Sequence, residues 1–276
     1  MGKQLLSQKH PVLYFLSVWE KRIKRCLAWY FGGKRYAVKR SEDKLPYRVK
    51  KHQSVLIRKL GCSDIQLQYN KVENLKIAIR KLDGILIKPG ETFSFCKLVG
   101  RPTKRKGYLP GMELSYGEAR AGIGGGLCQI ANLIHWLVLH SPLTVTERHH
   151  HSFDPFPDEG RVLPFGSGAT IFYNYIDYQV TNTTPYAFQI NLWVSEKCLE
   201  GELRISEELD YAYHVYEKEH EFLKIGESYY RKNEIWRNRI AKFESGKLLE
   251  TEQIAKNFAL VKYIPEQYRE VQEAPV

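Results

Sequence analysis

Three consecutive glycines that lead into a cysteine and an apolar stripe restrict the fold of this chain more than any other feature. The block Gly124-Gly125-Gly126-Leu127-Cys128-Gln129 is followed by apolar residues at helical spacing, namely Ile130, Leu133, Ile134, Leu137 and Val138. That spacing predicts an amphipathic helix with one buried face. Because glycine is unfavourable inside a helix, we predict that the helix begins at about Leu127, with Cys128 in its first turn.

A cysteine in the first turn of a helix has an unusual electrostatic environment. Free backbone N–H groups and the positive end of the helix dipole lie there, and both favour a thiolate over a thiol. We therefore expect Cys128 to have a lowered pKa and nucleophilic character. The alternative is that Cys128 is a small buried hydrophobic residue without a chemical role.

Composition limits the class of protein and its partners. With 276 residues, 43% of them apolar and 26% charged, the chain is long enough and apolar enough for one main globular domain with extensions. A net charge of +11 predicts an anionic partner. Five widely spaced cysteines without a CxxC pair argue against a disulfide framework and a zinc site. We expect free thiols in a reducing compartment, and neither a metal nor a cofactor.

The N-terminal region is basic and partly apolar. Residues 11–19 are too short an apolar run to span a bilayer, and no small-residue cleavage site follows them. This pattern predicts a cytoplasmic protein that is either free or peripheral to the membrane. The pattern of residues 12–31 predicts a basic helix, which either contacts a membrane surface or packs on the domain. Residues 34–61 are strongly basic but lack the interleaved aromatic residues of a nucleic-acid platform, so we expect no nucleic-acid partner.

The remaining pattern predicts an α+β fold. A helix is expected at 70–83, and alternating apolar residues predict strands at 92–95, 143–148, 169–180 and 188–194. The last two strands are expected to pair as an antiparallel hairpin or meander. We expect the N-terminal helices and the Cys128 helix to pack on a mainly antiparallel sheet, followed by a C-terminal β extension. The predicted parts are a basic region (1–60), a core domain (61–205) and a charged β-rich extension (206–276).

The order of polar residues in the core resembles that of papain-like thiol enzymes, in which a cysteine on a helix precedes a histidine on a strand. Three adjacent histidines, His149, His150 and His151, follow the predicted strand, and any of them could act as the base. Strand alternation would place His149 and His151 on one face. A third, orienting group could be Asp177 or Asn182. Backbone N–H groups near Cys128, or the side chain of Gln129, could stabilise an oxyanion.

These motifs together resemble the VanW family, which takes its name from glycopeptide (vancomycin) resistance gene clusters. The resemblance covers residues 70–200 most clearly, and the glycine-cysteine block is its most specific part. The residues that carry it are 88–95 (Lys-Pro-Gly-Glu-Thr-Phe-Ser-Phe), 124–129, Asn132-Leu133, 146–148, His151-Ser152, Ala169-Thr170, Ile176-Asp177 and 182–184. In the family an Asp usually precedes the Ala-Thr pair, whereas this sequence has Gly168 there.

The resemblance implies a peptidoglycan and antibiotic-resistance context for this bacterial-type chain. Some members of the family are implicated as cysteine-dependent L,D-transpeptidases. Carried over, this implies Cys128 as the nucleophile and His151 as the base. Asp177 would take the place of the orienting Asp that is missing at 168. The substrate-binding residues would be Gly124, Gly125, Gly126, Gln129, Asn132 and Ser152.

Two classes of function follow from these observations. The first is a thiol acyl-transfer enzyme that acts on peptidoglycan peptides through a thioester on Cys128. The second is a non-catalytic accessory protein, in which the glycine-rich helix N-terminus binds the carboxylate or phosphate of a cell-wall precursor.

Overall fold

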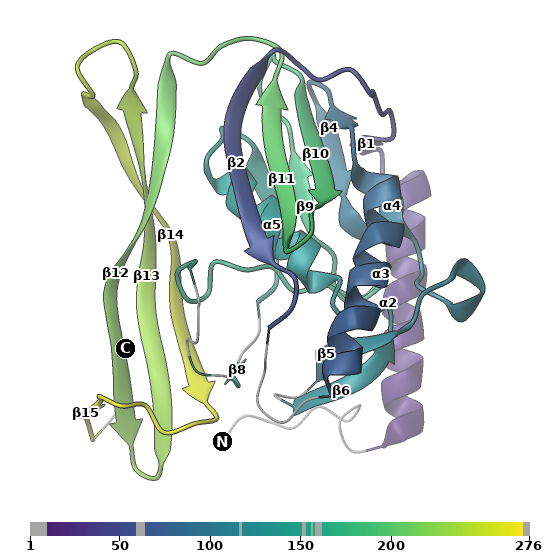
Figure 1. The fold of residues 1–276 in the computed structure, drawn as a ribbon, viewed down its shortest axis with the longest axis vertical. Helices are drawn as coiled ribbons and strands as arrows, with labels where there is room; N and C mark the ends of the chain where they lie inside the picture. The colour runs from purple at the N-terminus through teal and green to yellow at the C-terminus, as the bar shows by residue number, and fades with distance from the viewer. Residues whose placement is uncertain are drawn as a thin grey trace.

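The computed structural model describes residues 10–58, 64–115, 118–150, 153–155, 157 and 162–272. It confirms the α+β class, with helices packed on mainly antiparallel sheets and a C-terminal β extension. The helical elements are α2 (Pro11–Phe31), α3 (Ile65–Leu82), α4 (Phe95–Val99), the 3₁₀ turn η1 (Lys104–Lys106) and α5 (Cys128–Leu139). Figure 1 shows α2 at the outer edge of the core, and Lys97 of α4 lies against Trp29 and Tyr30 at its C-terminal end.

Two four-stranded sheets and a hairpin build the core. The first sheet has the order β1 (Arg35–Tyr36), β4 (Glu91–Ser94), β9 (Gln179–Thr181) and β7 (Thr144–Glu147). The second has the order β2 (Tyr47–Val55), β11 (Cys198–Ile205), β10 (Phe188–Val194) and β3 (Ile85–Ile87). The hairpin consists of β5 (Pro110–Ser115) and β6 (Glu118–Ile123).

Helix α5 forms the centre of the core. Its residues Ile130, Leu133, Ile134 and Leu137 are almost completely buried. It packs against β2 and β11, whereas α3 packs against β10 and β5. The predicted start of this helix is therefore confirmed to within one residue, because Leu127 is the N-cap and Cys128 the first helical residue.

A third sheet forms a separate layer beside the core (Figure 1). Its strands are β15 (Arg269–Glu270), β12 (Tyr211–Ile225), β13 (Ser228–Ala241), β14 (Leu248–Val261) and β8 (Phe153–Asp154). Strand β8 belongs to the core part of the sequence and pairs with the end of β14. The sheet therefore borders the segment that follows the three histidines.

Two predictions about strands are wrong. Residues 169–178 contain only one isolated bridge, between Phe172 and Ile176, and the strand β9 begins at Gln179. Strands β9 and β10 do not pair as a hairpin, because β9 pairs with β4 and β7 while β10 pairs with β3 and β11. The sequence pattern identified apolar strands but not their partners, since pairing is set by contacts remote in the chain.

Candidate functional site

The three glycines form a turn that only glycine can adopt without strain. Gly124 and Gly126 have φ values of 81° and 95°, in the left-handed region. Gly125 lies against the backbone of β5, where an added Cβ would be 2.1 Å from the carbonyl oxygen of Gly111. The side chain of Asn74 in α3 donates to the Gly125 carbonyl over 3.0 Å. The turn is thus clamped between α3 and β5, and it fixes the start of α5.

The turn leaves backbone donors free at the N-terminus of α5. Among the described residues, the N–H groups of Gly126 and Leu127 have no acceptor, and no side chain caps the helix. The N–H of Gln129 is used, because it donates to Gly126 over 3.0 Å. Free N–H groups at the positive end of a helix dipole favour a carboxylate, a phosphate or a developing oxyanion.

Cys128 is the first residue of α5 and is partly exposed. Its Sγ lies 3.7 Å from the Ile171 carbonyl oxygen. Burial raises the pKa of the thiol and the charge of Glu113 adds to the rise, whereas backbone hydrogen bonds at Ile171 and Cys128 itself oppose it. The expected lowering of the pKa is therefore wrong for this structure, because desolvation outweighs the helix terminus. The resting form is the neutral thiol.

A cavity of about 910 Å³ contains this cysteine and most of the predicted site. Its lining includes Cys128, the glycine turn and the side chains of Gln129, Asn132 and His150. A volume of this size suits a peptide or a similar medium-sized ligand. His151 and Ser152 lie outside the described residues, so their predicted roles stay predictions.

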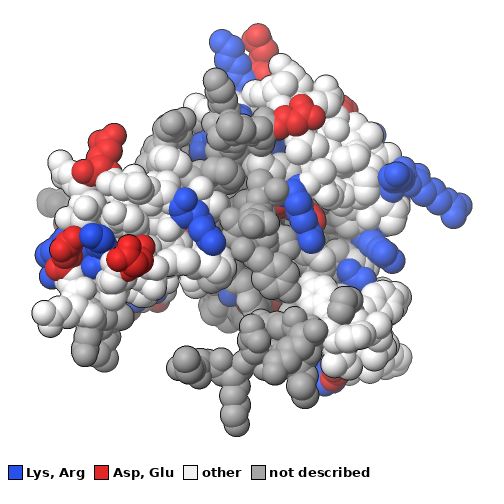
Figure 2. All heavy atoms as spheres, turned by 90° about the horizontal axis from the view of Figure 1, so that it is seen from below, with Lys and Arg blue, Asp and Glu red and all other residues white. Residues whose placement is uncertain are grey.

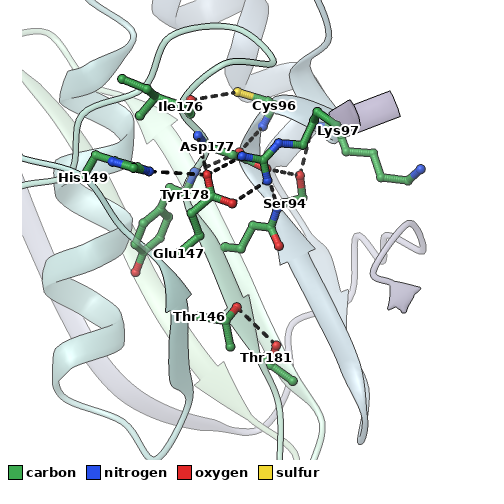
Figure 3. Close-up of polar contacts among 12 residues, drawn as sticks. Ser94, Cys96, Lys97, Thr146, Glu147, His149, Ile176, Asp177, Tyr178 and Thr181 are labelled. Atoms are coloured by element: carbon green, nitrogen blue, oxygen red, sulfur yellow. Dashed lines mark hydrogen bonds and ion pairs between the residues drawn. The ribbon is translucent and has the colours of Figure 1, made fainter. Parts of the chain in front are cut away.

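The two described histidines of the triplet have different surroundings. His150 lines the cavity, and burial, followed by the charges of Arg148 and His149, lowers its pKa. It is therefore neutral at pH 7 and able to accept a proton. His149 instead lies 3.6 Å from the Glu147 carboxylate (Figure 3). Strand β7 ends at Glu147, so the strand alternation assumed for the histidines does not reach them.

Asp177 lies outside the cavity lining, in a buried polar cluster at the start of α4 (Figure 3). Its carboxylate accepts hydrogen bonds from Ser94 Oγ over 2.5 Å and from the Cys96 N–H over 2.8 Å. Its own N–H donates to Glu147 over 3.0 Å. Burial raises the pKa of this carboxyl, and the bonds from Ser94 and Cys96 oppose the rise. The arrangement ties β9 to the β4–α4 turn.

The other candidate for an orienting residue, Asn182, is also buried away from the cavity lining. Its Nδ2 donates to the carbonyl oxygens of Ile87 and Tyr186, over 2.9 and 2.7 Å. Its Oδ1 accepts the N–H and hydroxyl of Thr184. These hydrogen bonds stabilise the turn after β9, so the described contacts of Asn182 are structural.

The side chains of two predicted substrate-binding residues, Gln129 and Asn132, form hydrogen bonds within the fold. The Nε2 of Gln129 donates to Ser54 Oγ and to the Val55 carbonyl, each over 2.9 Å, so it ties α5 to β2. The expected oxyanion role of its side chain is therefore not supported by this geometry. Asn132 Oδ1 accepts the Ala169 N–H over 2.7 Å.

The side chain of Asn132 also lies close to Gly168, the position at which this sequence departs from the family pattern. A Cβ at Gly168 would lie 2.6 Å from Asn132 Oδ1. A larger residue at 168 would therefore require Asn132 to move and would disturb the wall of the cavity beside Cys128.

Sequence reasoning missed a group of cations in the cavity. Arg22 from α2 and Arg101 from the segment after α4 both line it, and Tyr173 lies beside them. Neither arginine forms an ion pair with a described residue, and the buried Nε of Arg22 has no acceptor there. Burial, followed by the charge of Arg101, lowers the pKa of Arg22. Because the two arginines are far apart in sequence, no local motif could have identified them.

The acidic residues of the lining have partners. Glu113 pairs with Arg120 across the β5–β6 hairpin at 2.8 Å, and Asp154 pairs with Arg231 of β13 at 3.0 Å. The described lining therefore has an excess of unpaired positive charge. In the view from below, Lys and Arg side chains border the middle of the molecule, where the core and the C-terminal sheet face each other (Figure 2).

Comparisons with known proteins place the chain in a family. Residues 70–204 match the family model described as VanW like protein. The chain is 30% identical over 274 residues to the vancomycin B-type resistance protein VanW of Enterococcus faecalis, which covers 99% of each chain. It is also 29% identical over 114 residues to YoaR of Bacillus subtilis, covering 41% of this chain and 36% of that protein. No solved structure matches it significantly. The chain belongs to the VanW family.

Proposed function

We propose that this protein is a thiol-dependent acyl-transfer enzyme that acts on peptidoglycan-type peptides. The observation that carries the proposal is that Cys128, free backbone donors at the start of α5 and the neutral His150 line one cavity. A substrate carbonyl beside Cys128 could direct its oxygen toward the N–H groups of Gly126 and Leu127. The name of the Enterococcus relative, a vancomycin B-type resistance protein, supports a vancomycin-resistance context.

The raised pKa of Cys128 and the lowered pKa of His150 favour a general-base mechanism over a preformed thiolate–imidazolium pair. A thiol with a raised pKa and an imidazole with a lowered one are both neutral at rest. The imidazole accepts the thiol proton as the Sγ–carbon bond forms, and it returns that proton to the leaving amine as the peptide C–N bond breaks. An amine acceptor then attacks the thioester to give transpeptidation, whereas water gives hydrolysis.

The two cavity arginines, which form no ion pair with a described residue, supply a binding site for a charged group of the substrate. The guanidinium groups of Arg22 and Arg101 are planar donors that suit a carboxylate or a phosphate. Stem peptides carry carboxylates, and cell-wall precursors carry phosphates. The cavity would thus bind an anionic group at the arginines while the scissile carbonyl lies at Cys128.

The test is acylation of the purified protein by a peptidoglycan-type peptide, measured by intact mass. We expect a thioester adduct that Cys128→Ser abolishes, while its melting temperature stays close to that of the wild type. Replacing the base, by His150→Ala or His151→Ala, should slow acylation about 10²–10⁴-fold. His149→Ala is the matched control, because His149 faces Glu147.

The non-catalytic binding function predicts a different set of results. It is favoured by the raised pKa of Cys128, because less of this thiol is ionised at neutral pH than of an ordinary cysteine. In that case no adduct forms, and Cys128→Ser binds the peptide as tightly as the wild type. Alkylation of Cys128 would then have the same pH dependence in all three histidine variants, and the acyl-transfer proposal would be rejected.

A further inference from the structure

The outer face of α2 is an unusually large exposed apolar surface for one helix. Its exposed apolar residues are Val12, Leu13, Phe15, Leu16, Trp19, Ile23, Leu27, Tyr30 and Phe31. Phe31 is 83% exposed and Tyr30 is 73% exposed. Contiguous apolar patches of this kind mark sites of interaction with proteins or membranes.

The inner face of α2 is held firmly, so the outer face has a defined orientation. Val18 and Trp29 are buried against the core. Arg25 forms a partly buried ion pair with Glu147 of β7. At the C-terminal end, Lys97 Nζ of α4 lies 5.5 Å from the ring centre of the buried Trp29.

The width and composition of this surface favour a lipid interface over a second copy of the chain. A coiled-coil seam is a narrow stripe of aliphatic residues, whereas this surface is broad and includes the aromatic residues Phe15, Trp19, Tyr30 and Phe31. Aromatic side chains of this kind are enriched at the level of lipid headgroups. Amphipathic helices that lie in the membrane plane combine such residues with Lys and Arg.

Charge also favours an anionic bilayer. Helix α2 carries four basic residues, of which Arg22 and Arg25 face the core and Lys21 and Lys24 do not enter it. Its one acidic residue, Glu20, pairs with Lys24, and the whole chain has a net charge of +11. Two copies of such a chain repel each other, whereas anionic lipid attracts it. No helix in the described ranges is long and apolar enough to cross a membrane. An orientation in the plane of the surface therefore fits α2.

We propose that the outer face of α2 docks the protein on the surface of a bilayer that contains anionic lipid. The apolar side chains insert among the headgroups and acyl chains, and Lys21 and Lys24 contact lipid phosphates. Because Arg22 of the same helix lines the Cys128 cavity, docking would hold that cavity close to the membrane surface. This last consequence depends on the proposed function, but the docking itself does not.

Vesicle co-sedimentation of the full chain tests the proposal. We expect binding to phosphatidylglycerol vesicles at least about tenfold tighter than to phosphatidylcholine vesicles, with the difference reduced in 0.5 M salt. The triple variant Leu16→Glu, Ile23→Glu, Leu27→Glu should lose at least about tenfold in vesicle binding. These side chains are 52–56% exposed, so circular dichroism and the melting temperature should stay unchanged.

A matched control separates this surface from general hydrophobicity. Val38→Glu with Phe243→Glu removes two exposed apolar side chains elsewhere on the molecule and should leave vesicle binding unchanged. Equal binding of the triple variant and the wild type, or a wild type that stays in the supernatant, would overturn the proposal. A wild-type dimer in analytical ultracentrifugation that the triple variant abolishes, without vesicle binding, would assign the surface to a second copy instead.

Discussion

At the scale of single residues, a buried lysine supports the glycine turn that begins α5. Lys71 of α3 is 8% exposed, and its Nζ donates to the Leu56 carbonyl and to Gln68 Oε1. Its aliphatic stem lies against Gly126, where an added Cβ would be 2.1 Å from Lys71 Cγ. Burial, followed by the charge of Arg58, lowers the pKa of Lys71 from 10.5 to about 8.

This lowered pKa predicts a specific pH dependence of stability. Between about pH 8 and 10.5 the unfolded chain binds more protons at this lysine than the folded chain does, so stability rises with pH through that window. The gain is ~3 kcal/mol at most. We expect Lys71→Met to remove this rise in urea unfolding, whereas Lys76→Met, at an exposed position of α3, should keep it. The same rise in both variants would contradict the assignment.

At the scale of elements, α2 depends on its ion pair with the core. The Arg25 and Glu147 side chains are 19% and 18% exposed, and Glu147 also accepts the Asp177 N–H over 3.0 Å. The pair therefore connects α2 to the polar cluster of Figure 3. Removing the arginine leaves a partly buried carboxylate without its main partner.

We accordingly expect Arg25→Met to destabilise the packing of α2 on the core by about 2–4 kcal/mol. Amide hydrogen exchange, followed by mass spectrometry over residues 11–31, should become faster while α3 and α5 keep their protection. Lys24→Gln is the matched control, because Lys24 pairs with Glu20 at a position where both side chains are more than half exposed. Faster exchange throughout the molecule would argue that the ion pair supports the whole fold and not α2 in particular.

At the scale of the whole molecule, the C-terminal sheet is attached to the end of the central helix. Arg237 of β13 donates to the carbonyls of Leu139 and Ser141, over 3.2 and 3.0 Å. Both carbonyls belong to buried residues at the C-terminal end of α5. Trp136 and Leu139 of α5 also pack with Val215 and Ile235 of the sheet. The two layers are thus coupled at the C-terminal end of α5 as well as through the pairing of β8 with β14, while Cys128 lies at the other end of the helix.

We expect Arg237→Met to cost about 2–3 kcal/mol, because it leaves two buried carbonyls unsatisfied. If the sheet is coupled to the core mainly here, calorimetry should show a broadened or split transition. Lys256→Gln on β14, whose lysine is 71% exposed, should leave a single transition within about 0.5 kcal/mol of the wild type. A single unshifted transition in Arg237→Met would show that the apolar contacts hold the layers without it.

The sequence by itself determined the local elements of this protein and its family. Glycine within a helix has a cost in conformational entropy, and apolar residues at helical spacing indicate a buried face. The start of α5 and the position of Cys128 in its first turn followed from these two rules. Helix 12–31 and the strands at 92–95 and 143–148 were predicted for the same reason, since each pattern is contained within a short segment.

Only the tertiary structure decided which polar groups meet. The order of Cys128 and Asp177 in the chain predicted that they share one site. Asp177 instead joins Ser94 and Cys96 in a buried cluster, while Arg22 and Arg101 line the cavity with Cys128. The raised pKa of the Cys128 thiol could not be predicted from the sequence either. Burial by segments remote in the chain causes the rise and outweighs the local backbone hydrogen bonds at the start of the helix. Hydrogen bonding and desolvation depend on neighbours in space, and sequence order does not specify those neighbours.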